Sequence, residues 1–156
     1  MQIHFIAVGN RMPAWVQNGY NEYAKRLPRE YELLLKEISP GKRGKNCDTA
    51  RIIKEEGNKM LAAVPPGANI VTLEVDGKPW STPELANVLQ RWQANSQPIA
   101  LLVGGPEGLS ETVRRAASES WSLSRLTFPH PLVRIIVAEQ LYRAWSILNN
   151  HPYHRE

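Results

Sequence analysis

Short apolar runs alternate with longer amphipathic segments along the 156-residue chain. Four of the runs have the length and the aliphatic content of buried strands. They span residues 2–8, 31–38, 69–75 and 99–103. The segments between them have helical spacing and are long enough to cross back over a sheet. This alternation predicts an α/β fold, with a mostly parallel sheet flanked by helices.

Capping residues and breakers set the expected element boundaries. The first helix is expected over 15–26, and it ends before Pro28. Asp48, Thr82 and Ser110 each precede a helical segment and are good N-caps. The Asp76-Gly77 pair predicts a turn that closes the third strand. Residues 126–128 are a candidate fifth strand, and a long last helix is expected after Pro131.

The last helix is apolar on more than one face. Its aliphatic and aromatic positions run from Leu132 to Leu148 and leave only a narrow polar stripe. Such a helix must be buried nearly all round. We expect a second copy of the chain to cover part of it, as a homodimer. The alternative is a central helix within one monomer.

Composition limits where the protein works and what it binds. The formal net charge of +4 and the pI of about 9.4 permit an anionic partner. The one cysteine, Cys47, fits a reducing compartment. The chain begins without a recognisable secretory signal. Charged residues such as Arg134 and Glu139 interrupt the longest apolar stretch, so no membrane span and a cytoplasmic location are expected.

A glycine-rich corner, LLVGGPEGLS at 101–110, follows the fourth strand. It lacks the Gly-Lys-Ser/Thr ending of a phosphate loop and the Gly-x-Gly-x-x-Gly spacing of a dinucleotide site. Two interpretations remain, a plain turn or a ligand-binding corner at the carboxyl end of a strand. The segments LEVDGKPW (73–80) and SLSRLTFPHPLVR (122–134) form similar corners. Three such loops predict a pocket for a flat, hydrogen-bonding ligand such as adenine.

These three motifs, together with AVGNRMPAWV, GKRGKN and the tail NNHPYHRE, resemble the SPOUT class of RNA methyltransferases. The resemblance extends over the whole chain, so residues 1–156 are expected to form a single SPOUT domain. Within the class it is closest to small bacterial enzymes that methylate N3 of a pseudouridine in large-subunit ribosomal RNA. It implies a C-terminal trefoil knot, S-adenosylmethionine as the methyl donor, and a homodimer whose active site includes residues from both subunits.

The resemblance also implies which residues bind the cofactor. Carried over by position, these are Leu73, Gly104, Gly105, Ser124, Arg125, Leu126, Thr127, Phe128 and Pro129. The glycines, with Gly108, would let the main chain approach the ligand closely.

Methylation of an imide nitrogen needs help with proton removal, and no metal. The candidates for catalysis are His130, Glu139, Arg143 and His154. Glu139 and Arg143 are four residues apart, and from the spacing alone an ordinary helical ion pair is favoured over a catalytic role for them. We choose no single base among His130, Glu139 and His154, and positioning alone is a further alternative.

Basic and aromatic residues suggest where RNA binds. Lys42, Arg43 and Lys45 are candidate phosphate contacts, with Arg11 a weaker one; a solvated loop is the alternative. The resemblance makes Tyr153 and Arg155 substrate contacts, through stacking and a phosphate. His151 and His154 have no converging ligands, so no metal site is expected.

Because the charge is small, we expect the RNA target to lie in an assembled ribosomal particle. Two other functions stay open, a non-catalytic RNA-binding module and a different nucleotide-binding enzyme.

Overall fold

The computed structural model describes residues 1–155, and its centre is a five-stranded sheet with every strand parallel. The strands are β1 (Gln2–Val8), β2 (Glu32–Ile38), β3 (Asn69–Lys78), β4 (Ile99–Val103) and β5 (Glu119–Trp121), in the order β2-β1-β4-β3-β5. The predicted fold class, a parallel α/β sheet flanked by helices, is confirmed. Because all strands run the same way, their carboxyl ends meet at one edge, where such sheets bind ligands.

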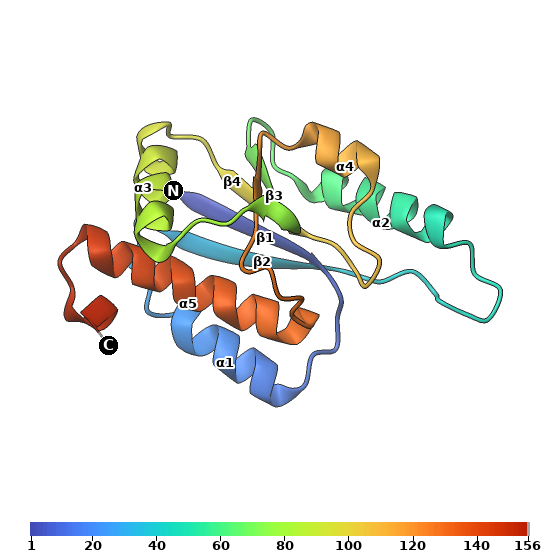
Figure 1. Ribbon diagram of the computed structural model, residues 1–156, viewed down its shortest axis with the longest axis horizontal. Coiled ribbons are helices and arrows are strands. Elements are labelled where there is room, and N and C mark those ends of the chain that lie inside the picture. The colour runs from blue at the N-terminus through green and yellow to red at the C-terminus, as the bar shows by residue number, and fades with distance from the viewer. Residues whose placement is uncertain (156) are drawn as a thin grey trace.

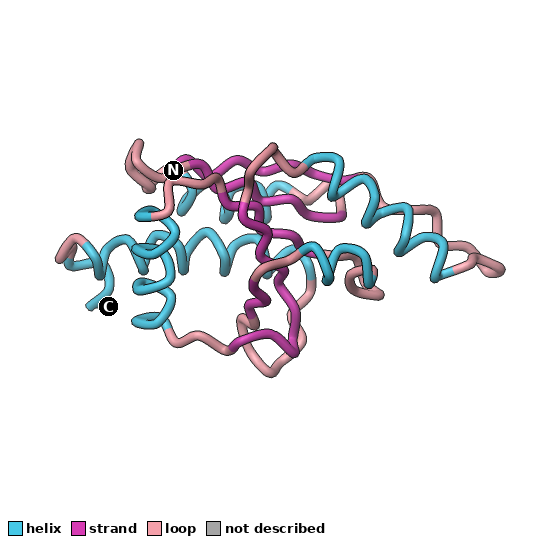
Figure 2. The backbone as a smooth tube through the Cα atoms, turned by 90° about the horizontal axis from the view of Figure 1, so that it is seen from above, coloured by secondary structure: helices cyan, strands magenta, loops and turns pink. Residues whose placement is uncertain are grey.

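Helices cover both faces of the sheet (Figures 1 and 2). One face carries α1 (Ala14–Ala24), α3 (Thr82–Ala94) and α5 (His130–Leu148), with α5 packed between the other two. The other face carries α2 (Thr49–Ala63) and the short α4 (Glu111–Ala116). After α5, the tail folds into a 3-10 turn, η1 (Pro152–Arg155), that packs on α5.

The central strand, β4, is apolar at every position because both its faces are covered. In β4, Ile99, Leu101 and Val103 point into the core under α1, α3 and α5. Ala100 and Leu102 point into the smaller core under α2 and α4. The continuous apolar run in the sequence is therefore the signature of a sheet with two buried faces.

Two of the three predicted helix caps are confirmed. The Asp48 carboxylate accepts from the Arg51 amide at 3.3 Å, and the Ser110 hydroxyl accepts from the Val113 amide at 3.2 Å. The third prediction, Thr82, was wrong by one residue. Ser81 is the N-cap, and its hydroxyl accepts from the Glu84 amide at 3.2 Å, so Thr82 is the first helical residue.

The predicted end of the third strand and the predicted fifth strand were both wrong, because β3 is longer than expected and pairs with β5. β3 does not turn at Asp76-Gly77 but continues to Lys78. A Cβ on Gly77 would lie 2.8 Å from backbone atoms of Ser120 and Trp121, so this glycine serves the close approach of β5. The fifth strand is accordingly Glu119–Trp121, and residues 126–128 lie in a loop beyond it.

The last helix, α5, is buried along one side and half-buried along much of the rest. Val137, Ala138, Leu141 and Ala144 are fully enclosed within the single chain. Leu132, near the start of the helix, keeps 39% of its surface exposed, and Trp15 on the neighbouring α1 keeps 56%. A second copy covering this side stays a prediction, as does the trefoil knot.

Candidate functional site

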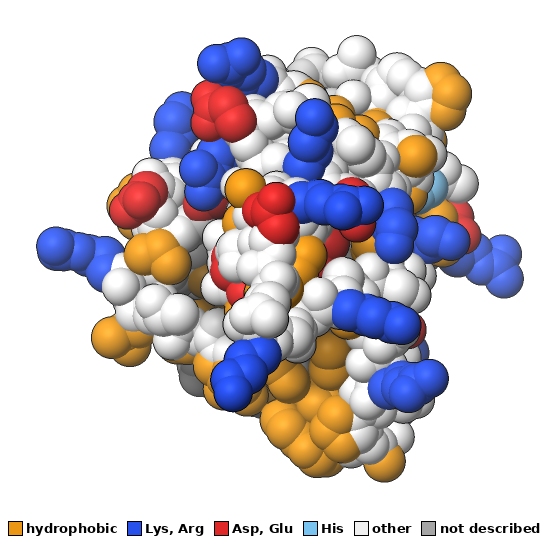
Figure 3. Space-filling model, turned by 90° about the vertical axis from the view of Figure 1, so that its right-hand side faces the viewer, with side chains coloured by type: hydrophobic (Ala, Val, Ile, Leu, Met, Phe, Trp, Pro, Cys, Tyr) orange, Lys and Arg blue, Asp and Glu red, His pale blue; other side chains and the backbone are white. Residues whose placement is uncertain are grey.

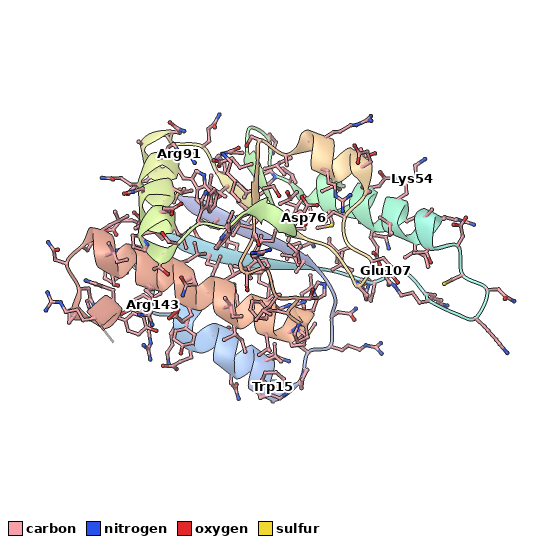
Figure 4. All side chains as sticks on the ribbon, in the orientation of Figure 1. Trp15, Lys54, Asp76, Arg91, Glu107 and Arg143 are labelled. Carbon is pink, nitrogen blue, oxygen red and sulfur yellow. The ribbon has the colours of Figure 1, made fainter. Side chains whose placement is uncertain are left out.

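A cavity of about 400 Å³ opens at the carboxyl edge of the sheet. Its walls come from the outer half of β3 and from the segments that follow β4 and β5, which are the three motifs that the sequence singled out. These are residues 73–76, residues 103–109 and most of 123–128, with side chains of α4 and α5 completing the wall. Figure 4 labels Asp76 and Glu107 on this side of the molecule.

The cavity gathers most of the residues expected to bind the cofactor. Seven of the nine line it: Leu73, Gly104, Gly105, Ser124, Leu126, Thr127 and Phe128. Arg125 is exposed and outside the lining, and Pro129 is the residue that precedes α5. The cavity therefore supports the three-loop arrangement, while the contacts of each residue with a ligand stay a prediction.

The glycine loop is folded tightly on itself. The Gly108 amide donates to the Gly105 carbonyl at 2.9 Å, and Gly108 has a φ of +86° that other residues rarely adopt. A Cβ on Gly104 would lie 2.5 Å from the Gly108 carbonyl oxygen. Gly104 and Gly108 thus keep the loop closed.

The cavity is lined by more acidic than basic side chains. Glu74, Asp76 and Glu107 line it, against the single guanidinium of Arg114. Arg114 donates to Glu74 at 2.6 Å, and the second Glu74 oxygen accepts from the Thr72 and Ser120 hydroxyls. Because Glu74 pairs with Arg114 and Glu107 with Arg43, Asp76 is the lining acid for which residues 1–155 supply no ion pair, and it favours a cationic ligand over a polyphosphate. Sequence reasoning missed these residues, although each acid lies inside one of the quoted motifs.

His130 is the one candidate for catalysis that lines the cavity. Its Nδ1 atom is buried and has no hydrogen-bond partner among the described residues. Burial lowers the pKa of its imidazole, and backbone hydrogen bonds at Gly104 and Gly105 only partly oppose this. His130 is therefore neutral at pH 7, and its unpaired Nδ1 is shielded from solvent.

The other candidates form a separate cluster where the tail folds back on α5. The Tyr153 hydroxyl donates to the Glu139 carboxylate at 2.8 Å, and Arg143 pairs with the same carboxylate at 3.0 Å. The Arg143 guanidinium also lies 4.8 Å from the Tyr153 ring centroid. His154 is partly buried, and its Nδ1 lacks a partner within residues 1–155. Glu139 and Arg143 thus hold the tail in place, as well as forming the expected helical pair.

One chain does not bring the tail cluster to the cavity. Glu139 is nine residues after His130 on α5, which places it about 14 Å further along the axis and on the opposite side of the helix. The tail is also seen at the far end of α5 from the glycine loop (Figure 1). A site that combined both groups would need two copies of the chain.

The basic loop at 40–47 divides into two kinds of residue. Lys42 and Lys45 are exposed, and neither forms an ion pair with another described residue. Arg43 instead turns back into the protein and pairs with Glu107 at 2.7 Å and with Glu56 at 3.0 Å. The loop remains a candidate for phosphate contact through its two lysines, but Arg43 is already occupied.

A smaller cavity of about 220 Å³ lies near the start of α1, and Arg11 is among its lining residues. Arg134 also lines this cavity. Its guanidinium donates to the Glu37 carboxylate at 2.8 Å and to the Gly9 carbonyl at 2.9 Å. Arg11 has a φ of +55°, unusual for a residue with a side chain.

The described part of the chain holds no cluster of three or more His, Cys, Asp or Glu side chains placed to bind a metal. Within residues 1–155, no helix has both the length and the apolar character needed to cross a bilayer.

A parallel sheet with a glycine-lined cavity at its carboxyl edge is typical of α/β proteins that bind nucleosides or related ligands. A family model described as "Predicted SPOUT methyltransferase" matches residues 1–154. The chain belongs to this family, and the resemblance identified from its motifs is confirmed.

Known proteins agree with this assignment. Ribosomal RNA large subunit methyltransferase H of Methylococcus capsulatus is 66% identical over 155 residues, which is 99% of this chain and 100% of that protein. Two solved structures share the fold at low identity. A putative methyltransferase of Legionella pneumophila, solved with bound cofactor SAM, has a TM-score of 0.52 at 10% identity, over 93% of this chain and 66% of its own. A putative methylase family protein of Neisseria gonorrhoeae has a TM-score of 0.52 at 12% identity, over 90% and 81%.

Proposed function

We propose that the protein transfers the methyl group of S-adenosylmethionine to N3 of a pseudouridine in large-subunit ribosomal RNA. Family membership and the name of the 66% identical relative support the reaction and the RNA. The observation that carries the proposal is the cavity built by three backbone-rich loops at the carboxyl edge of the sheet. The pseudouridine and its N3 atom come from the family resemblance.

The cavity suits this donor in size and charge. Its volume of about 400 Å³ lies within the range of ordinary small-molecule sites. When bound, S-adenosylmethionine supplies an already activated methyl group on a cationic sulfur. Asp76 favours that charge, and it disfavours ATP or a dinucleotide phosphate. The loops at Leu73, Gly105 and 124–128 would hold the adenosine through backbone groups.

Within one chain, His130 is the best-placed group to assist proton removal. It lines the cavity, is neutral at pH 7 and has an unpaired buried Nδ1. A neutral imidazole can accept the N3 proton of the target base if the two lie within hydrogen-bond distance. His154 is the second candidate, supplied by the tail of a partner subunit.

The working enzyme is a homodimer in this proposal. Glu139, Arg143 and Tyr153 form one ordered unit that the helix α5 keeps away from the chain's own cavity. The partner's tail would bring this unit, with Arg155, to the RNA bound at the other subunit's cofactor. Trp15, Leu132 and Leu126 are exposed apolar side chains near the start of α1 and α5. Figure 3 shows apolar side chains gathered on the α1 side of this face, as an interface requires.

The RNA would be recognised largely through its structure. A net charge of +4 is small for a protein that finds free RNA by electrostatics, so an assembled ribosomal particle is the proposed substrate. Lys42 and Lys45 would contact phosphates. With ribosomal RNA as its substrate, the enzyme would act in the cytoplasm.

Nucleoside mass spectrometry tests this function. Ribosomal RNA from a strain lacking the gene should lack one methylated pseudouridine, and the wild-type gene should restore it. Purified protein should restore it in isolated particles and far less in deproteinised RNA. An unchanged nucleoside profile would overturn the proposed reaction.

Calorimetry separates the remaining alternatives. A non-catalytic RNA-binding module predicts no heat with S-adenosylmethionine, and another nucleotide enzyme predicts heat with ATP or NAD. The proposed function predicts binding of S-adenosylmethionine and S-adenosylhomocysteine only.

A further inference from the structure

All three nitrogens of the Arg43 guanidinium donate hydrogen bonds within the protein. Its Nε donates to both oxygens of Glu107, at 3.1 and 2.9 Å, and one terminal nitrogen donates to one of them at 2.7 Å. The same terminal nitrogen reaches Glu56, and the other donates to the Gly41 carbonyl at 3.1 Å. The side chain is only 23% exposed, although its neighbours Lys42 and Lys45 point into solvent. With four of its five N–H groups engaged inside the protein, this guanidinium is poorly placed to hold an RNA phosphate.

The two acids that Arg43 joins lie on different elements. Glu107 is in the glycine loop and lines the cofactor cavity. Glu56 is on α2, where only 4% of its side chain is exposed, and its second oxygen accepts from the Gly41 amide at 2.8 Å. Arg43 therefore connects a fixed helix, the basic loop and the wall of the cavity through one planar group.

The glycine loop is the part of the cavity that most needs such a support. Three of its five residues from Gly104 to Gly108 are glycines, which restrict the backbone least. Arg43 packs directly on the loop, since a Cβ on Gly105 would lie 2.9 Å from its guanidinium. The guanidinium thus restrains the backbone position of Gly105 and the orientation of the Glu107 side chain. Both residues line the cavity where the cofactor is expected to bind.

We propose that Arg43 is a positioning residue that holds the glycine loop in its cofactor-binding shape, and that it does not contact RNA. The ion pair with Glu107 is the connection through which Arg43 acts. Glu56 fixes the other side of the guanidinium. This inference rests on the proposed function, because the ligand that binds against the glycine loop is taken to be S-adenosylmethionine. The Arg43–Glu107 ion pair also links the basic loop with Lys42 and Lys45 to the cofactor cavity.

Binding of S-adenosylhomocysteine to the purified protein, measured by calorimetry, tests the inference. Arg43→Met should weaken binding about tenfold or more, the effect expected when a hydrogen-bonded charge pair that shapes a site is lost. Glu107→Gln, which leaves the Arg43–Glu56 pair intact, should weaken it in the same direction by a smaller factor. Arg43→Lys should stay well below wild type, because an ammonium cannot bridge three groups in one plane.

The matched controls are Lys42→Met and Lys45→Met, which remove the same charge from the same loop. They should leave S-adenosylhomocysteine affinity within about twofold of wild type and raise KM for the ribosomal particle. In the Glu107→Gln background, Arg43→Met should lower the affinity for S-adenosylhomocysteine by a smaller factor than it does in the wild-type protein. The reason is that the two residues act through one contact.

The outcomes distinguish this inference from the function it rests on. No binding by the wild-type protein would overturn the function. Wild-type affinity in Glu107→Gln and in a folded Arg43→Met would overturn the inference alone. A thermal melt identifies any Arg43→Met sample that is unfolded, and Glu107→Gln then decides. An Arg43→Met effect confined to KM for RNA would also contradict it.

Discussion

The Tyr153 hydroxyl donates a 2.8 Å hydrogen bond to the Glu139 carboxylate, which ties the end of the chain to the middle of α5. Glu139 also pairs with Arg143, so one carboxylate holds both the tail and a basic residue expected to meet the substrate. Burial and the Glu139 carboxylate raise the pKa of the Tyr153 phenol, which keeps it protonated as a donor. The tail is therefore an ordered part of the protein.

Tyr153→Phe should impair the reaction while leaving the cofactor site intact. The ring would still pack on Tyr142, 4.6 Å away between centroids, but the bond to Glu139 would be lost. A hydrogen bond to a charged group contributes about 1.5–3 kcal/mol, so kcat/KM for the ribosomal particle should fall about tenfold or more. Affinity for S-adenosylhomocysteine should not change. Equal kcat/KM for Tyr153→Phe and the wild-type protein would show that the hydrogen bond between Tyr153 and Glu139 does not contribute to the reaction.

Gly104→Ala should disrupt the cavity. Its Cβ would lie 2.5 Å from the Gly108 carbonyl oxygen, so the closed loop has to move. We expect a loss of about 1–3 kcal/mol in unfolding free energy, as for other overpacked sites, and weaker cofactor binding. Gly44→Ala is the matched control, since a Cβ there meets nothing within 4 Å. Denaturant melts and calorimetry of both variants provide the comparison.

Arg134→Met should be strongly destabilising. Arg134 is only 3% exposed and joins the Glu37 carboxylate to the Gly9 carbonyl at the ends of β2 and β1. Its loss leaves the Gly9 carbonyl without this donor and should cost about 1.5–3 kcal/mol in urea unfolding. Arg51→Met breaks an exposed pair with Glu55 and should cost less than about 1 kcal/mol. Similar losses in the two variants would contradict this difference.

Acid should destabilise the protein in part through His130. Its pKa is lowered on folding from an ordinary value of 6.5, because burial penalises the charged ring. The unfolded chain therefore binds a proton more readily, and stability is lost as pH falls below about 6.5. The Tm drop between pH 7.5 and 5.5 should be smaller in His130→Gln than in wild type. An identical drop would mean that His130 titrates normally.

Mixing two inactive variants tests whether each site uses two chains. Gly104→Val would lack a working cavity and Arg155→Ala a working tail. If tail and cavity come from different subunits, half of the dimers in an equal mixture are mixed, and each has one complete site. The mixture should then recover about a quarter of wild-type activity. No recovery, with dimers confirmed by sedimentation, would place each site within one chain.

The sequence predicted most of the fold because apolar periodicity and capping act locally. β1 and β4 were predicted with their observed bounds, and Asp48 and Ser110 cap helices as expected. Gly77 was misinterpreted because an Asp-Gly pair usually marks a turn. Its real role, admitting β5, depends on Ser120 and Trp121, more than forty residues away.

The site was predicted less completely, because it also depends on contacts between residues far apart in the sequence. The three loops were found because glycines and strand ends are visible in the motifs. The pairing of Arg43 with Glu107 joins residues 64 positions apart and has no local signal. A basic loop with spaced glycines indicated an RNA contact, but only the fold shows that its arginine points inward.

A crystal structure of the protein with S-adenosylhomocysteine tests the central proposal most directly. The nucleoside should lie in the cavity between residues 73–76, 104–108 and 124–128, with its adenine bonded to backbone groups and its sulfur facing the end of α5 near His130. A ligand bound at any other place, or full occupancy in solution with this cavity empty in the crystal, would contradict it.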